Sequence, residues 1–457
     1  MGIGRGSARS SAETRRGRPR RRRPAAPSAP GREPRALALR VIRRVTERRA
    51  YSNLSLAAEL GRSGLPARDR QLAADLAYGT LRRLLILDGA IARAASRPLP
   101  DIDPEALALL RLGVYQLRFT RVPDHAAVYA TVGLASGRHR GFVNAVLRTV
   151  AAESWEPPVG GRDEDVSART GLAAWVVSEL RRLLPQDEVE PAAARLASQA
   201  DLALRTNVCR TSTGGFVAAL RGAGFDPRAG EHHPDVVHVA SAVPTLLPGY
   251  REGWFTVQDE ASALVVAALQ VQPGERILDA CAGPGGKATH LACQAGPDGL
   301  VVAGDVRLNR AVMVRATAAR LGVPVRVLAQ DVRTPAVRGG FDAVLVDAPC
   351  SGLGAARRRP ELLWRPRRGD LARLARLQVA ILVGGADLVG PGGRLVYSVC
   401  TFPRAETEAA VRSFLAKRPE FEPFDIPGPD GSAPAHRLWP HRHGTDAMFY
   451  AGFRRPG

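Results

Sequence analysis

The feature that most constrains the fold is an alternation of short apolar runs with helical stretches, which starts at residue 257. Apolar runs of this length are typical of buried strands, and the stretches between them show the apolar periodicity of helices. The alternation predicts a mostly parallel sheet with helices on both faces. We expect strands at Arg276–Ala280, Val301–Gly304, Val325–Leu328, Phe341–Val346, Gly393–Ser398 and Met448–Phe453, and helices at Lys287–Gln294, Leu308–Leu321, Asp370–Leu388 and Ala405–Ala416.

An acid or a thiol follows each of the first five strands. Parallel strands point their carboxyl ends to one edge of a sheet, and open sheets bind their ligands at that edge. One aspartate there could simply cap a helix, but five such residues together predict a functional site. They are Asp279, Asp305, Asp331, Asp347 and Cys400.

A glycine-rich loop joins the first strand to the helix that follows it. Glycine lets the backbone approach a ligand closely, although a plain tight turn has the same composition. Asp305 adds information, because an acid at the end of the second strand can accept both ribose hydroxyls of a nucleoside cofactor. Together these features indicate NAD or S-adenosylmethionine. The loop is Cys281-Ala282-Gly283-Pro284-Gly285-Gly286-Lys287, and its lysine is one of two in the chain.

Two cysteines belong to the predicted edge, Cys350 shortly after Asp347 and Cys400 after the fifth strand. A thiol in such a position, beside helix N-termini, can be held as a thiolate. Thiolate attack on C6 of cytosine makes C5 nucleophilic, provided that a carboxylic acid protonates or hydrogen-bonds N3. C5 then accepts a methyl group from a sulfonium, and loss of the C5 proton releases the thiol. The sequence alone does not rank the two thiols.

Residues 35–150 show helical periodicity and no convincing strand pattern, which predicts an all-α bundle. Residues 151–256 follow as a connector and a small α/β subdomain. We expect helices at Arg35–Arg49, Asp69–Leu85, Pro104–Phe119, Ala126–Ser136 and Ala173–Leu184, and strands at Leu202–Val208 and Val236–Ala240.

The charge of the chain indicates a polyanionic partner. The formal net charge is +21, of which the first 35 residues, with eleven arginines and two glutamates, supply only +9. A basic excess spread over folded parts is typical of proteins that bind RNA or DNA, although the arginine bias of a GC-rich genome gives a similar composition. Residues 1–34 are predicted to be a disordered basic tail.

The five cysteines, in a chain without an apolar signal sequence, favour a reducing cytoplasm with free thiols. Cys209 and Cys293 are then predicted to be small buried hydrophobic residues. No apolar run is long enough for a transmembrane helix, so we expect no membrane span. We also expect no metal, and take a monomer as the working assumption.

Several segments resemble the bacterial RsmB/Sun family of 16S rRNA cytosine-C5 methyltransferases, over roughly residues 35–455. In the C-terminal half these segments are Phe255–Ser262, Leu278–Lys287, Asp347–Gly352, Tyr397–Thr401 and His443–Asp446. Those similar to the NusB-like domain of the family are Ala50–Asn53, Arg68–Arg70, Tyr78–Arg82 and Gly141–Arg148.

The resemblance implies roles for the site residues. Cys400 would be the nucleophile, and Cys350 would assist product release. The loop from Cys281 to Lys287 would contact S-adenosylmethionine together with Asp305, Asp331 and Asp347, and Asp347 would also face the base. The implied domains are a NusB-like RNA-binding domain at 35–150, the connector and small α/β subdomain at 151–256, and a class I, Rossmann-like methyltransferase domain at 257–457.

Other functions remain open at this point. A DNA cytosine-C5 methyltransferase would use the Pro-Cys thiol as nucleophile, but Cys400 and the helical domain favour RNA. An NAD-dependent dehydrogenase explains neither thiol, and a non-enzymatic RNA-binding protein would not need Cys350 and Cys400 at one edge. A methyltransferase of another RNA, such as tRNA, fits the same residues. The helical domain either grips the RNA or only packs on the catalytic domain.

Overall fold

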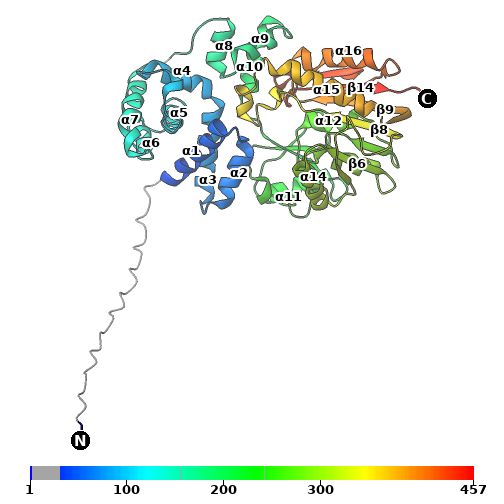
Figure 1. The fold of residues 1–457 in the computed structure, drawn as a ribbon, viewed down its shortest axis with the longest axis horizontal. Coiled ribbons are helices and arrows are strands. Elements are labelled where there is room, and N and C mark those ends of the chain that lie inside the picture. The colour runs from blue at the N-terminus through cyan, green and yellow to red at the C-terminus, as the bar shows by residue number, and fades with distance from the viewer. Residues whose placement is uncertain (3–30, 155, 241) are drawn as a thin grey trace.

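The computed structural model describes residues 1–2, 31–154, 156–240 and 242–457. A helical N-terminal part and a larger α/β part lie side by side (Figure 1). The predicted basic tail, residues 1–34, lies almost entirely outside the described residues. Its end is helical rather than disordered, because α1 already begins at Arg32.

The N-terminal part, residues 32–152, consists of helices that share one apolar core, which confirms the all-α prediction. In α1, Leu37, Val41 and Ile42 fall on one stripe and are at most 1% exposed. The predicted helix at 69–85 is in fact broken at Arg83, and two helices were not predicted, α2 and α7. The helices are α1 (Arg32–Glu47), α2 (Ser52–Arg62), α3 (Ala67–Arg82), α4 (Leu84–Ala94), α5 (Pro104–Phe119), α6 (Asp124–Val132) and α7 (Gly137–Ala152).

Three helices and a small antiparallel sheet connect this bundle to the large sheet. The small sheet has the order β2-β3-β1-β4 and packs on α11 through Phe216 and Phe255, whose rings lie 5.0 Å apart. The elements are α8 (Asp163–Thr170), α9 (Ala174–Arg181), α10 (Gln186–Ala197), β1 (Leu202–Thr206), α11 (Thr213–Gly222), β2 (Arg228–Ala229), β3 (Val236–Val239) and β4 (Phe255–Val257).

The large sheet has eight strands, with the order β10-β14-β9-β8-β5-β6-β7 and β13 paired with β14. Strands β5 to β9 run parallel, as predicted, whereas β14 is antiparallel to β9. The strands are β5 (Arg276–Asp279), β6 (Leu300–Asp305), β7 (Arg326–Ala329), β8 (Phe341–Asp347), β9 (Val389–Val399), β10 (Glu422–Pro423), β13 (Ala435–Leu438) and β14 (Met448–Arg454).

Helices cover both faces of this sheet, which confirms the predicted fold class. Along β8, Val344 and Val346 pack toward α15 and α16, while Ala343 and Leu345 pack toward the opposite helices. A central strand buried on both faces explains why its sequence is apolar throughout. The helices are α12 (Glu260–Ala268), α13 (Gly286–Ala295), α14 (Leu308–Leu321), α15 (Asp370–Ala386) and α16 (Glu408–Lys417); the small remaining elements are β11 (Ile426–Gly428), β12 (Gly431–Ala433) and α17 (Pro440–His443).

The two parts are joined by hydrogen bonds from long side chains to backbone carbonyls. Arg82 of α3, only 6% exposed, donates to the carbonyls of Ser198 at 2.7 Å and of Arg357 at 2.9 Å. In the opposite direction, the Trp364 indole donates to the Leu81 carbonyl at 2.9 Å. These buried contacts fix the helical part against the loop that follows β8.

The expectation of free thiols is wrong for two of the five cysteines. Cys209 and Cys293 form a disulfide that ties the turn after β1 to the end of α13. Cys281, Cys350 and Cys400 are free. Disulfides are rare in a reducing cytoplasm. The predicted cytoplasmic location is therefore supported by three free thiols instead of five. No helix of the described residues is both long and apolar enough to cross a membrane.

Candidate active site

The strand order of the large sheet reverses between β5 and β8, which are neighbours although β6 and β7 lie between them in sequence. In open parallel sheets, ligands bind in the crevice beyond the carboxyl ends of the strands at such a switch point. A cleft of about 650 Å³ opens there. It is lined by most of the predicted site residues: Cys281, Gly283, Asp305, Asp331, Asp347, Cys350 and Cys400.

The glycine-rich loop turns tightly from β5 into α13. Gly285 precedes the helix with φ of 110°, a conformation that favours glycine. A Cβ atom at Gly283 would lie 2.6 Å from a carboxylate oxygen of Asp305, so a larger residue here would have to displace the Asp305 side chain. Of this loop, Cys281 and Gly283 line the cleft, so its backbone approaches the space that a nucleoside cofactor would occupy.

Two acids at neighbouring strand ends have defined environments. Asp305, 4% exposed, accepts hydrogen bonds from the backbone N–H groups of Gly283 at 3.2 Å and Arg307 at 2.9 Å. Asp331 forms an ion pair with Arg333 at 2.5 Å, and the hydrogen bonds from Arg333 lower the pKa of the Asp331 carboxyl. Asp305 is thus oriented by backbone groups, while Asp331 stands at the more exposed end of the cleft.

Lys287, at the start of α13, is held by Asp347. The Nζ atom of Lys287 donates to one carboxylate oxygen of Asp347 at 2.7 Å, and the Ser398 hydroxyl donates to the other oxygen, also at 2.7 Å. Burial lowers the pKa of Lys287, but the charge and hydrogen bond of Asp347 outweigh burial and raise it. The pair is therefore an ammonium next to a carboxylate, which explains a lysine in a chain that otherwise uses arginine.

The two predicted thiols touch: the Sγ atoms of Cys350 and Cys400 lie 3.3 Å apart. A hydrogen bond from Cys350 lowers the pKa of Cys400 against the effect of burial, and the cations Lys287 and Arg359 lower it further. That same hydrogen bond, together with burial, raises the pKa of Cys350. These pKa directions and the nearby cations favour Cys400 over Cys350 as a thiolate, a distinction that sequence patterns did not provide.

Glu406 was missed by the sequence analysis. Its buried carboxylate accepts hydrogen bonds from the backbone N–H of Ser351 at 2.9 Å and from the Ser351 hydroxyl at 2.6 Å. The Ser351 hydroxyl also lies 2.7 Å from that of Thr401. Because Ser351 and Thr401 follow the two cysteines directly, this network fixes both thiol-bearing loops against each other. A lone glutamate after a strand gives no sequence signal for such a contact.

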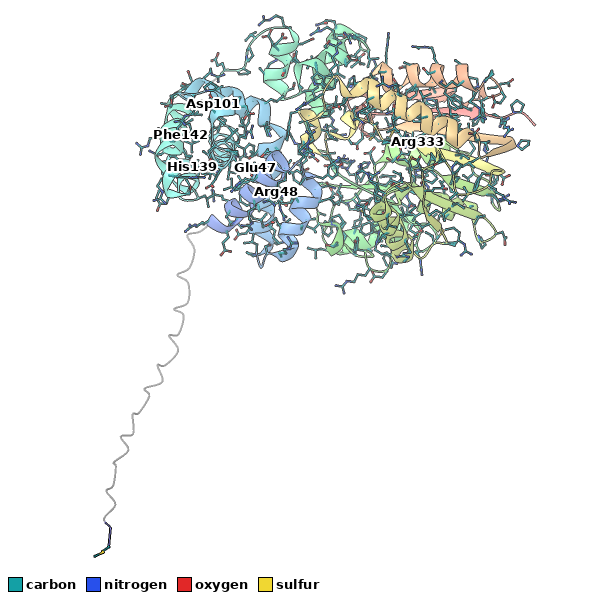
Figure 2. The ribbon with its side chains drawn as sticks, viewed as in Figure 1. Glu47, Arg48, Asp101, His139, Phe142 and Arg333 are labelled. Carbon is teal, nitrogen blue, oxygen red and sulfur yellow. A yellow bond between two sulfur atoms is a disulfide. The ribbon has the colours of Figure 1, made fainter. Side chains whose placement is uncertain are left out.

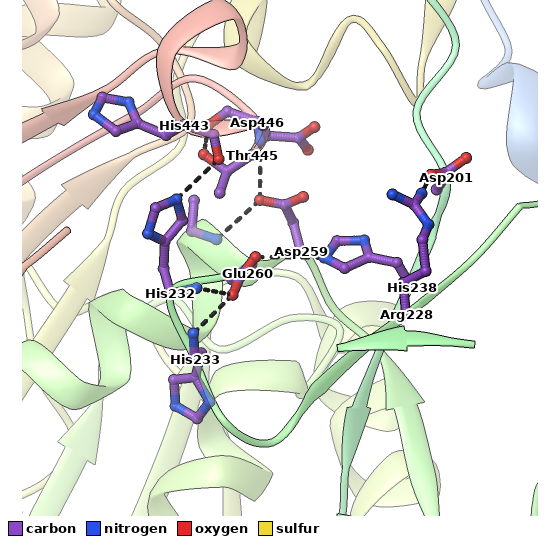
Figure 3. A network of polar contacts seen from close by, with 12 residues as sticks. Asp201, Arg228, His232, His233, His238, Asp259, Glu260, His443, Thr445 and Asp446 are labelled. Atoms are coloured by element: carbon purple, nitrogen blue, oxygen red, sulfur yellow. Dashed lines mark hydrogen bonds and ion pairs between the residues drawn. The ribbon is translucent and has the colours of Figure 1, made fainter. Parts of the chain in front are cut away.

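A second buried network holds the loop after β8 from the other side. Asp259, the N-cap of α12, accepts a hydrogen bond from the backbone N–H of Asp446 at 3.1 Å (Figure 3). Arg358 bridges the two acids, at 2.6 Å from Asp259 and 3.1 Å from Asp446. Burial, followed by the charge of Asp259, raises the pKa of Asp446 to about 6. Residues from three distant segments thus position the loop that carries Cys350.

The reversed strand order, the glycine-rich loop and the acids at the strand ends define a Rossmann-like domain with a cleft for a nucleoside cofactor. The family model described as 16S rRNA methyltransferase RsmB/F matches residues 266–454, and the NusB family model matches residues 32–152. The chain belongs to the RsmB/F family of RNA methyltransferases, and its N-terminal part is a NusB domain. The resemblance seen in the sequence is thereby confirmed.

Individual relatives match nearly the whole chain. A methyltransferase of Mycobacterium tuberculosis is 40% identical and covers 97% of this chain and 99% of its own length. Ribosomal RNA small subunit methyltransferase B of Pseudomonas putida is 34% identical over 92% of this chain and 97% of its own. Among solved structures, that of PH0851 has a TM-score of 0.82 at 26% identity, over 93% of this chain and 99% of its own.

Proposed function

We propose that this chain methylates C5 of a cytosine in 16S rRNA, with Cys400 as the nucleophile. The observation that carries this proposal is the contact of two thiols, 3.3 Å apart, beside the Lys287–Asp347 ion pair in the cleft. A dehydrogenase or a plain RNA-binding protein would have no use for this arrangement. The rRNA substrate is supported by the name of the Pseudomonas putida relative and by the description of the family model.

The cofactor proposed for the cleft is S-adenosylmethionine. The loop from Cys281 to Lys287 would hold it, with Asp305 accepting the ribose hydroxyls and Asp331 at the outer end. The fit is supported by Gly283, where a side chain would collide with Asp305, and by the backbone bonds that orient Asp305. When bound, S-adenosylmethionine supplies an electrophilic methyl group on a sulfonium.

The first step is addition of the Cys400 thiolate to C6 of the cytosine. A sulfur–carbon bond forms, and the electron pair of the C5–C6 double bond moves toward C5 and the ring nitrogen N3. In this proposal Lys287 passes a proton to Asp347 along their hydrogen bond, and Asp347 passes a proton to N3 of the base. C5 can then take the methyl group.

Release of the product reverses the addition. Water takes the C5 proton, the electron pair of that bond restores the C5–C6 double bond, and the bond between C6 and the sulfur of Cys400 breaks with its electron pair returning to sulfur. The N3 proton returns to the Lys287–Asp347 pair. Cys350 is placed to assist, since its sulfur lies 3.3 Å from that of Cys400 and its thiol can donate a hydrogen bond to the departing thiolate. Both cysteines are therefore needed, but for opposite halves of the reaction.

Two single substitutions separate these roles. Cys400→Ala should abolish both methylation and covalent capture of RNA. Cys350→Ala should still form the adduct but release it at least about 100-fold more slowly, because it lacks the donor that assists release. The measurement is an RNA–protein band on a denaturing gel, with unmodified 16S rRNA and S-adenosylmethionine. The Cys350→Ala, Cys400→Ala double variant is the control and should give no band. An adduct from Cys400→Ala alone would reverse the assignment.

The substrate is tested separately from the chemistry. Bisulfite sequencing of total RNA from a deletion strain should show loss of one or more 5-methylcytosines in 16S rRNA, restored by the wild-type gene. An unchanged 16S map with a cytosine lost from tRNA would transfer the same chemistry to a different RNA. A map unchanged in all RNA would refute the proposed activity.

A further inference from the structure

The cleft is not built by the methyltransferase part alone. Arg49 and Tyr51, from the segment that links α1 to α2 in the NusB domain, line the same 650 Å³ cleft as Cys350 and Cys400. Both residues are exposed, and 44% of Tyr51 is accessible although its ring is large and apolar. An exposed aromatic ring at the cleft offers a face on which a base can stack.

This linking segment is fixed in place by the catalytic part. The guanidinium of Arg365 donates to three carbonyl oxygens at the end of α1 and beyond it: Val45 at 3.0 Å, Arg49 at 3.1 Å and Ala50 at 2.8 Å. The backbone N–H of Ser52 donates to the buried Glu361 carboxylate at 3.3 Å. The position of Tyr51 relative to the two thiols is therefore set by direct contacts across the domain boundary.

Arg359 connects Tyr51 to the reactive thiol. Its guanidinium carbon lies 4.5 Å from the centre of the Tyr51 ring, within the range of a cation–π contact. Arg359 is also close enough to Cys400 for its charge to lower the pKa of that thiol. The side chains of Tyr51, Arg359 and Cys400 thus form a short row from the NusB domain to the reacting sulfur.

The surroundings of this row carry positive charge. Arg49, Arg359, Arg365 and Arg373 all line the cleft on this side. Two acids offset part of this charge: Asp370 lies 3.7 Å from Arg373, and the buried Glu361 lies 3.7 Å from Arg359. Proteins that hold single-stranded nucleic acid combine such a basic groove with aromatic rings on which bases stack, and an arginine plane adds to the stack.

We propose that Tyr51, with Arg49 beside it, forms a nucleotide-binding subsite for the RNA residue next to the target cytosine. The Tyr51 ring, backed by Arg359, stacks on that neighbouring base, and Arg49 contacts its phosphate. The NusB domain then takes part in substrate selection at the reacting base itself. This inference rests on the proposed function, because it takes RNA as the ligand of the cleft.

The test compares three substitutions at one position. Tyr51→Leu keeps an apolar side chain but removes the ring, and should raise the KM for unmodified 16S rRNA about tenfold, as loss of one stacked base predicts. Tyr51→Phe keeps the ring and should stay within about twofold of wild type, since the phenyl face stacks equally well. Tyr51→Ala should resemble Tyr51→Leu. In all three, the KM for S-adenosylmethionine should not change.

Two controls separate the subsite from general effects. Arg49→Ala should raise the KM for RNA. Arg48→Ala should not, because Arg48 does not line the cleft, although it too is exposed at the end of α1 (Figure 2). Ultraviolet cross-linking of the RNA should label the peptide that contains Tyr51. Equal RNA KM values for Tyr51→Leu, Tyr51→Phe and wild type would overturn the subsite, as would a rise caused equally by Arg48→Ala.

Failure of the proposed function gives a different result. If wild-type protein forms no 5-methylcytosine in this assay, the proposed chemistry fails, and RNA binding measured by fluorescence anisotropy still tests the subsite. If wild type methylates normally and Tyr51→Leu is indistinguishable from it in both KM and RNA affinity, the chemistry stands and the subsite fails.

Discussion

At the scale of single residues, the two thiols of the cleft differ in environment although they are in contact. The charge of Asp347 disfavours a thiolate at either position, but the cations Lys287 and Arg359 act on Cys400, whereas Cys350 has Glu406 as a further acid beside it. The contact between the sulfurs lowers the pKa of Cys400 and raises that of Cys350. Because thiolates and not thiols react with carbon electrophiles, the difference in pKa between the two cysteines can be measured through their alkylation rates.

We expect the alkylation of Cys400 by iodoacetamide to depend on Cys350. In wild type, the hydrogen bond from Cys350 lowers the pKa of Cys400, so the rate should reach half its plateau below the pH typical of a free thiol. Cys350→Ala removes the donor, and the midpoint should move to higher pH. Mass spectrometry of the Cys400 peptide gives the rate. Cys281, whose pKa burial raises, is an internal control and should stay unmodified over the same range. An unchanged midpoint in Cys350→Ala would contradict this ranking.

Sequence patterns located the acids and thiols at the sheet edge because each follows a strand directly, and parallel strands end together. Asp305, Asp347 and Cys400 could be placed in this way. Glu406 and Tyr51 could not, since their positions depend on contacts between segments far apart in the chain. The same reason explains the unforeseen pairing of Cys209 with Cys293, which are separated by 84 residues.

At the scale of elements, the loop between β8 and α15 is the part on which the site depends most. This loop carries Cys350 near its start and also contains Arg359. It contacts the NusB domain through Arg365. Within it, the Gly354 N–H donates to the Cys400 carbonyl at 3.0 Å, and the Gly354 carbonyl accepts from the Ala447 N–H at 3.1 Å. Gly354 is thus hydrogen-bonded both to Cys400, which follows β9, and to Ala447, which precedes β14.

We expect Gly354→Ala to destabilise the protein and slow methylation. The new Cβ atom would meet the Ala447 carbonyl oxygen at 1.9 Å, and backbone cannot move aside as a side chain can. Overpacking of this kind costs about 1–3 kcal/mol, which should lower the Tm by several degrees. The matched control is Gly89→Ala in α4, where no atom lies within 4 Å and the helix should gain about 1 kcal/mol. A Tm of Gly354→Ala equal to wild type would contradict the close approach.

Most strands and helices of the large sheet could be predicted because their apolar periods are regular. The predicted helix at 308–321 has the observed bounds of α14. The antiparallel edge was harder to foresee, since β10 and β13 are short and polar, and their pairing with β14 depends on tertiary contacts. The break at Arg83, between α3 and α4, lacks the glycine or proline that would mark it in the sequence.

At the scale of the whole molecule, the basic charge is divided between folded parts and the N-terminal segment. The cleft gathers arginines from both domains, and these contacts have fixed geometry. Residues 1–30 contribute nine further arginines and one glutamate. The positive charge of residues 1–30 can neutralise phosphates anywhere along an RNA and carries no base specificity.

We therefore expect deletion of residues 1–30 to weaken RNA binding in a salt-dependent way without changing the chemistry. Each phosphate contact on a single strand adds about 0.7 to the slope of log affinity against log salt concentration. Removal of nine arginines should reduce that slope by several units and leave kcat at saturating 16S rRNA unchanged. A variant with the same nine arginines replaced by glutamine keeps the length of the segment and should behave like the deletion. An unaltered slope in both variants would assign the RNA affinity to the folded parts alone.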